Sequence, residues 1–101
     1  MNSSSLTWQT DAHLAVTALS SALRDLAGVA ETPLPIHLSE LWGPDGPYEI
    51  AVRGHRWALE GTPISLRARR GGRDYRLDLE PLVDRDGRIV GVTGWATALD
   101  A

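Results

Sequence analysis

The last third of the chain restricts the fold most, because its residues alternate between apolar and polar as the two faces of a β-strand do. In residues 63–70, Ile64, Leu66 and Ala68 share one side, with serine and arginine between them. A second run, residues 73–82, carries the corresponding set Tyr75, Leu77 and Leu79. A period of two is that of a strand with one buried face, so both runs are predicted to be strands.

Two turns connect these strands to each other and to a third. Gly71 and Gly72 suit the positive φ of a tight hairpin, and residues 84–87 (DRDG) suit the next reversal. The third strand, residues 88–99, is apolar on both sides. One side carries Ile89, Thr93, Trp95 and Leu99, and the other carries Val90, Val92, Ala96 and Ala98. The alternation leaves open which of these two sets is the outer one.

The first half of the chain combines two short strands with helical segments. Residues 5–21 predict two strands around a turn at Asp11 and Ala12. Residues 21–28 predict a short helix that ends at Gly28. The following segment, 29–47, holds four of the six prolines and is predicted to be mostly loop, with one or two helical turns within IHLSELWG.

Residues 47–61 carry the clearest helix signal. Pro47 suits the first helical position, and Gly61 suits the residue just past the end. At 100° per residue, one helix face carries Tyr48, Ala51, Val52, His55, Ala58 and Leu59. Ile50 and Trp57 lie together on the opposite side. Because strands stand before and after a helical block, the order predicts an antiparallel α+β domain.

Length and composition fit a single domain over residues 1–101, with residues 1–5 expected to be a disordered N-terminal segment. The net charge of −3 argues against nucleic acid as a partner. No apolar run approaches the roughly 20 residues that cross a bilayer, and the first residues lack the pattern of a signal peptide. These features predict a cytoplasmic protein with no membrane partner.

Three segments, taken in order, resemble the PAS domain family over nearly the whole chain. Residues 6–28 look like its opening: a strand ending in Thr-Asp, a second strand, and a short helix closing on glycine. Residues 55–61 (HRWALEG) resemble the end of its long connecting helix. Residues 73–100 resemble its closing hairpin, in which a Pro-Leu pair, an Asp-x-x-Gly turn and Gly-Val-x-Gly precede a final aspartate.

The resemblance implies a PAS-like, five-stranded antiparallel sheet with short helices and one longer connecting helix packed on one face. It also implies a non-catalytic sensory and dimerisation domain of a bacterial signal-transduction protein. Its effector would be a two-component histidine kinase, a cyclic-dinucleotide enzyme or a transcriptional regulator. A small ligand between sheet and long helix would shift the sheet, and the terminal strand would relay the change. The candidate pocket residues are Tyr48, Val52, His55, Leu66, Tyr75, Leu77 and Trp95.

In this family the outer face of the sheet is commonly covered by a flanking helix or by a second subunit. An exposed apolar patch of several hundred Å² is unusual on a monomer. We therefore expect a homodimer through Val90, Val92, Ala96 and Ala98, or through the alternate set. Ile50 and Trp57 either form a second partner contact or are covered by the loop before the helix. The alternative function is a constitutive protein–protein interaction module with no ligand.

The sequence offers few candidates for cofactor or enzyme chemistry, and no cofactor or metal is predicted. Because the chain has no cysteine, flavin-cysteinyl and coumarate adducts cannot form. His55 is either an axial ligand for haem or a partly buried histidine bonded to the backbone. A small α+β enzyme with a conical pocket would need an acid beside His55, and that helix face carries none.

Five arginines surround the hairpin between the first two strands of the last third: Arg67, Arg69, Arg70, Arg73 and Arg76. Asp74 and Asp78 are interleaved with them. The group either binds an anion or an acidic partner, or forms a solvated strand face with cross-strand ion pairs worth about 0.2–1 kcal/mol each. The sequence leaves both interpretations open.

Overall fold

The computed structural model describes residues 6–42 and 48–99. The expected disordered segment 1–5 and the expected helix start at Pro47 lie outside the described residues. In chain order the elements are β1 (Leu6–Asp11), β2 (Ala15–Leu19), α1 (Ser21–Ala27), β3 (Ile36–His37), α2 (Ser39–Trp42), α3 (Tyr48–Leu59), β4 (Ile64–Arg70), β5 (Arg73–Val83) and β6 (Ile89–Ala98).

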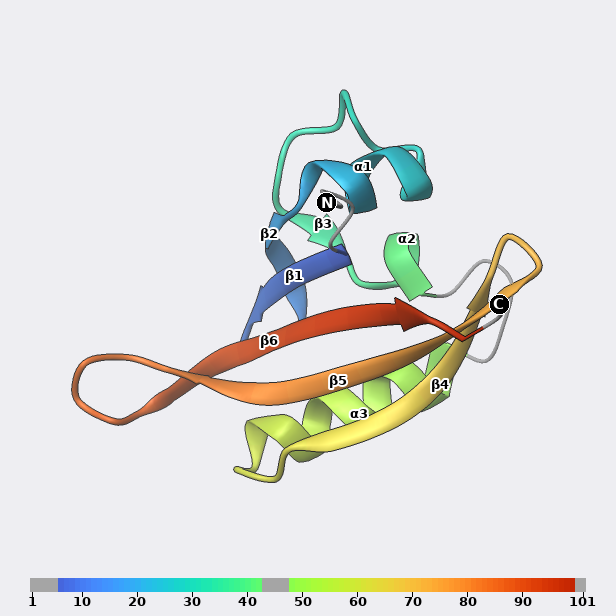
Figure 1. Ribbon diagram of the computed structural model, residues 1–101. Helices are drawn as coiled ribbons and strands as arrows, with labels where there is room; N and C mark the ends of the chain where they lie inside the picture. The colour runs from blue at the N-terminus through green and yellow to red at the C-terminus, as the bar shows by residue number, and fades with distance from the viewer. Residues whose placement is uncertain (1–5, 43–47, 100–101) are drawn as a thin grey trace, which may run out of the picture.

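The described strands form one curled antiparallel sheet in the order β3-β2-β1-β6-β5-β4 (Figure 1). The α+β class is as predicted, but the sheet has six strands where five were expected. The additional strand, β3, pairs Ile36 with Val16 and His37 with Ala15. Two residues between prolines give no periodic signal, which is why this segment was expected to form only loop and helical turns.

Local sequence explains the ends of the helices. The Ser20 hydroxyl caps α1 by accepting a hydrogen bond from the backbone N–H of Leu23 at 3.3 Å. Gly28 ends α1 with a φ of 72°, in the left-handed region that glycine enters at little cost. In α3, Glu49 lies in the first turn and Arg56 in the last, where each charge complements the helix dipole.

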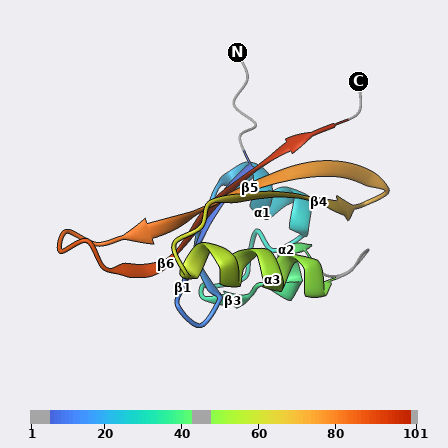
Figure 2. The same cartoon turned by 90° about the horizontal axis from the view of Figure 1, so that it is seen from below.

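All three described helices lie on the same side of the sheet, as Figure 2 shows. The core between the two layers contains Trp8, Val16, Tyr75, Leu77, Leu79 and Val92 from the sheet and Leu23, Leu41, Trp42, Ala51 and Ala58 from the helices. Helix α3 approaches the sheet closely at Gly54, because a Cβ there would overlap the side chain of Leu66. This contact places the long helix directly over β4 and β5.

The orientation of β6 corrects two of the sequence predictions. Ala96 lies opposite Leu77 in the register of β5 and β6, so it faces the core, and Val92 is fully buried. Trp95 lies opposite Asp78 and is 37% exposed on the outer face. The alternate set expected for this strand is therefore the outer one, and Trp95 does not belong to the inner pocket.

The other two residues of the expected interface lie near the ends of the same strand. Ala98 pairs with Tyr75 and is exposed at the end of β6. Val90 is 41% exposed beside the irregular register between Leu82 and Val83. The β5–β6 hairpin that carries Val90 extends beyond the rest of the molecule (Figure 1). The partner contact expected for these residues remains a prediction.

Arg70 connects the sheet to two helices. It is therefore not part of a solvated strand face, which was one of the two interpretations of the arginine group. Its guanidinium group donates to the carbonyl oxygens of Leu41 at 2.9 Å and Ala27 at 3.1 Å, near the carboxyl ends of α2 and α1. Arg69, in contrast, forms an exposed ion pair with Asp74 at 3.0 Å. Arg70 therefore stabilises the packing of the short helices.

We expect Arg70→Met to lower the free energy of unfolding by about 2 kcal/mol, because two charge-assisted hydrogen bonds are lost. The matched control Arg69→Met should cost much less, since exposed ion pairs contribute little. Urea unfolding followed by circular dichroism measures both changes. Equal costs for the two variants would contradict the assignment.

Candidate functional site

The centre of the inner face is a buried hydrogen-bonded pair from α3 and β1. His55 is fully buried, and its Nε2 accepts a hydrogen bond from the indole Nε1–H of Trp8 at 3.1 Å. Its other nitrogen, Nδ1, lies 2.7 Å from the backbone oxygen of Ala51. Because Nε2 accepts, the proton of the neutral imidazole is on Nδ1, which donates to Ala51. Both nitrogens are therefore engaged within the domain.

This arrangement bears on the possible role of His55 as a haem ligand. Iron binds an imidazole nitrogen through its lone pair, and the Nε2 lone pair already receives the hydrogen of Trp8. Burial lowers the pKa of His55 below 6.5, an effect larger than the opposing hydrogen bond to Ala51. His55 is thus a neutral acceptor for Trp8, and this geometry does not fit an axial ligand.

The lowered pKa of His55 predicts a loss of stability in mild acid. Between the folded-state pKa and the unfolded value of 6.5, the unfolded chain binds more protons than the folded one. The free energy of unfolding should therefore fall as the pH decreases below 6.5 and level off once the folded-state pKa is passed. Urea midpoints between pH 8 and pH 4.5 test this, and His55→Gln should remove this part of the pH dependence. Unchanged dependence in the variant would contradict the prediction.

Two further aromatic rings, those of Trp42 and Tyr75, extend from this pair. The ring centroids of Trp8 and Trp42 are 5.3 Å apart, and those of Trp42 and Tyr75 are 5.8 Å apart with their planes at 65°. The buried Nε1–H of Trp42 has no hydrogen-bond acceptor among the described residues. Buried polar groups are nearly always paired, and among the described residues this N–H and the Nε of Arg70 are the exceptions.

The structure brings most of the predicted pocket residues together. His55, Tyr75 and Leu77 are buried on the inner face, and Val52 and Leu66 pack partly buried against the same core. Tyr48 begins α3, but its side chain lies outside the described residues. Sequence reasoning missed Trp8 and Trp42. The alternation of β1 could have indicated Trp8, whereas Trp42 lies in a proline-rich segment without a usable period.

The inner face is closely packed around these residues. A Cβ at Gly94 would lie 2.5 Å from Cζ2 of Trp8, so the indole rests directly on β6. Among the grooves that the described residues line, one of about 340 Å³ is formed on α3 by Glu49, Val52, Arg53 and Arg56. Trp95 lines another, of about 190 Å³, on the outer face.

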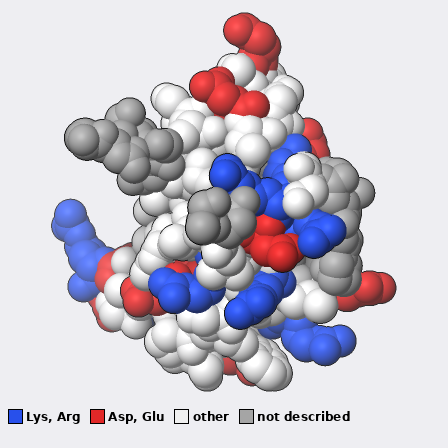
Figure 3. Space-filling model, turned by 45° about the vertical axis from the view of Figure 1, so that its right-hand side comes forward, with Lys and Arg blue, Asp and Glu red and all other residues white. Residues whose placement is uncertain are grey.

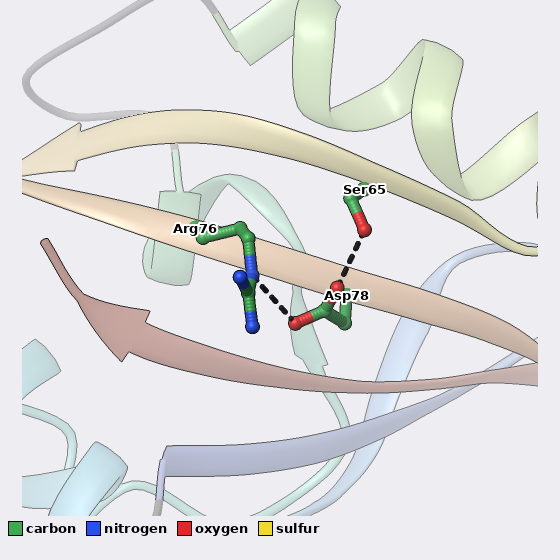
Figure 4. A network of polar contacts seen from close by, with 3 residues as sticks. All are labelled: Ser65, Arg76 and Asp78. Carbon is green, nitrogen blue, oxygen red and sulfur yellow. Dashed lines mark hydrogen bonds and ion pairs between the residues drawn. The ribbon is translucent and has the colours of Figure 1, made fainter.

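The outer face of the sheet is mostly polar. Ser65 donates to one carboxylate oxygen of Asp78 at 2.5 Å, and the Nε–H of Arg76 donates to the other at 3.1 Å (Figure 4). Trp95 lies directly across from Asp78 on β6. The described part of the chain contains no group of three or more residues able to hold a metal ion, and none of its helices is long and apolar enough to cross a membrane.

No family model matches the chain, and no curated protein matches it. Solved structures do match. A sensory box sensor histidine kinase from Vibrio cholerae has a TM-score of 0.73 at 13% identity, over 97% of this chain and 81% of that one. A domain of an HTR-like protein from Haloarcula marismortui has a TM-score of 0.77 at 15% identity, over 97% of this chain and all of that one.

A third similar structure is the VqmA dimer of Vibrio cholerae, described in relation to its target DNA. It has a TM-score of 0.78 at 16% identity over 95% of this chain, which spans about 46% of VqmA. VqmA bound to DPO matches with a TM-score of 0.77. At these identities the likeness concerns the fold, and it agrees with the sheet and helices described above. The chain therefore has the PAS-like fold of sensory-box domains.

Proposed function

We propose that this chain is a PAS-family sensory domain, without catalytic activity, that binds a small molecule beside Trp42 on the inner face of the sheet. The observation that carries the proposal is the buried Nε1–H of Trp42, which no described residue satisfies. A buried unpaired donor costs about 1–3 kcal/mol. A ligand that supplies an acceptor removes that cost and so gains affinity at this position.

The surroundings of the N–H define the class of ligand. Trp8, Trp42 and Tyr75 present aromatic surfaces, and the acid–base group beside them, His55, is neutral. Such a site favours a small, planar, uncharged molecule with a carbonyl oxygen or a ring nitrogen as its acceptor. A similar solved structure is described as VqmA bound to DPO, which supports a ligand-binding function for this chain.

The same contacts suggest how binding is relayed. Trp42 packs on Trp8, and Trp8 both bonds to His55 of α3 and rests on Gly94 of β6. A ligand that moves Trp42 would therefore act on the long helix and on the last strand together. The shift can be no larger than the difference in ligand affinity between the two states. The recipient is an effector module, of which a histidine kinase is the type suggested by the similar structures.

We further propose that the domain acts as a homodimer through the outer face of the sheet, with Trp95 at the contact. Trp95 is 37% exposed and lines a groove of about 190 Å³ with Ser65 and Asp78. A partly exposed indole on a polar face is typical of a protein contact. The absence of a nucleic-acid partner stays a prediction from the net charge of −3.

The close packing of the inner face favours a second candidate function. Gly54 leaves room on α3 for Leu66 of the sheet, Gly94 leaves room on β6 for Trp8 of the neighbouring strand, and His55 has both nitrogens bonded. A core filled in this way suits a constitutive interaction module, in which the sheet binds a partner and no ligand enters. The two functions differ in whether the N–H of Trp42 acquires an acceptor.

Native mass spectrometry of the purified protein, combined with an absorbance scan from 300 to 700 nm, separates these functions. The sensory proposal expects extra bound mass that is lost in Trp42→Phe, because phenylalanine has no N–H to donate. Trp57→Phe, on the exposed side of α3, is the matched control and should keep the bound mass. A protein without bound mass, together with a Trp42→Phe variant at least as stable as the wild type, would support the interaction module.

A further inference from the structure

We propose that the free edge of β4 is a docking site for an extended segment of a partner protein in which apolar and acidic residues alternate. This inference concerns a surface separate from the inner site and does not depend on the proposed function. Among the strands that the structure describes, β4 ends the sheet order and pairs on one side only, with β5. An edge strand presents unpaired N–H and C=O groups that another strand can bind.

The inner side of this edge is apolar and incompletely covered. Ile64, Leu66 and Ala68 of β4 are only partly buried against the core. Two contacts fix the rotation of α3: Gly54 lies against Leu66 of β4, and His55 lies against Trp8 of β1. At 100° per residue, Ile50 and Trp57 lie on the side of Gly54 that is turned away from His55. They are therefore on the side of the helix nearest the β4 edge. These two side chains are 42% and 48% exposed. A strand added to β4 could pack its inward side chains on them.

The outer side of the edge is basic. Ser65, Arg67 and Arg69 point outward along β4 and are exposed. Arg69 is paired with Asp74, but the side chain of Arg67 forms no ion pair or hydrogen bond with any described residue. Its neighbour across the strand pair is another arginine, Arg76. Figure 3 shows the molecule with the right-hand side of Figure 1 turned forward. Basic and acidic side chains lie side by side on this face.

These charges select the occupant of the edge. If two copies of β4 paired antiparallel about their centres, Arg67 of each copy would lie opposite Arg67 of the other, and like charges in that position are destabilising. A partner strand with acidic residues on its outward positions avoids this repulsion and pairs with Arg67. The edge thus disfavours self-association and favours a strand of alternating apolar and acidic residues.

The test uses two fluorescein-labelled peptides of about eight residues, one alternating valine with glutamate and the other valine with lysine. Fluorescence anisotropy gives their affinities for the full chain, and ¹⁵N–¹H spectra locate the binding. We expect the glutamate peptide to bind about tenfold more tightly than the lysine peptide at low salt, with shifts in the amides of residues 64–70. Arg67→Glu should reverse the preference, and Arg85→Glu at the distant β5–β6 turn should leave it unchanged.

A second pair of variants tests the apolar side of the edge. Ile50→Ser and Trp57→Ala replace exposed side chains, so they should leave the fold intact while weakening both peptides. Equal binding of the two peptides, a preference unaffected by Arg67→Glu, or no binding at millimolar concentration would overturn the proposal. Self-association of the protein with protection of the β4 amides would overturn it in favour of a second copy as the occupant.

Discussion

Replacing Gly91 with alanine is expected to lower the free energy of unfolding by about 3 kcal/mol or more. A Cβ at residue 91 would overlap the backbone carbonyl oxygen of Thr10. This atom belongs to β1, which pairs with β6 through Thr10 opposite Val92 and Asp11 opposite Gly91. Because a backbone atom cannot move aside as a side chain can, the two strands would have to separate at the centre of the sheet.

Urea unfolding followed by circular dichroism measures the effect of Gly91→Ala, and Gly72→Ala is the matched control. Gly72 lies in the β4–β5 turn with a φ of 77°, and a Cβ there would meet no atom within 4 Å. Its substitution should cost only about 1 kcal/mol, for the left-handed backbone alone. A loss in Gly91→Ala no larger than that in the control would show that β1 and β6 are not so closely paired.

Trp8→Ala is expected to cost about 4 kcal/mol, whereas Trp95→Ala should cost less than about 1 kcal/mol. Trp8 is 1% exposed, packs on Trp42, and donates the hydrogen bond that satisfies Nε2 of His55. Its loss leaves a large cavity and an unpaired buried acceptor. Trp95 is on the adjacent strand but faces outward.

The two tryptophan variants make the same substitution on opposite faces of one sheet. A difference between their urea midpoints therefore reports the burial of the side chain and not the type of residue removed. Trp8→Phe adds a finer comparison, because it keeps an aromatic ring but removes the N–H that His55 accepts. We expect a cost between those of the two alanine variants. If Trp95→Ala were as destabilising as Trp8→Ala, β6 would present the opposite face to the core, and the corrected orientation of this strand would be wrong.

Several elements could be predicted from the sequence because their signals are local. The alternation in β4 and β5 placed Ile64, Leu66, Tyr75, Leu77 and Leu79 on the inner side, as observed. Gly28 and Gly61 marked the ends of helices because their positive φ suits glycine. The face of α3 that carries Ala51, His55 and Ala58 was also correct, since a helical period depends only on neighbouring residues.

The candidate site could be predicted only in part, because its key contacts join distant segments. His55 was placed inward by its helix, but its partner Trp8 is 47 positions away, so no local pattern indicated the hydrogen bond. The buried N–H of Trp42 likewise follows from packing against Trp8 and Tyr75. The pairing of β3 with β2 depended on the same kind of distant contact.

The sequence by itself determined the α+β class, the PAS-like order of elements and the inward faces of the strands that carry polar residues on one side only. The tertiary structure alone decided the orientation of β6 and the presence of the additional strand β3. It also decided the hydrogen bond between Trp8 and His55 and the bonds of Arg70 to the short helices. A period of two orients a strand only when its two faces differ in polarity. In β6 both faces are apolar, and the pairing of Ala96 with Leu77 and of Trp95 with Asp78 selects between them.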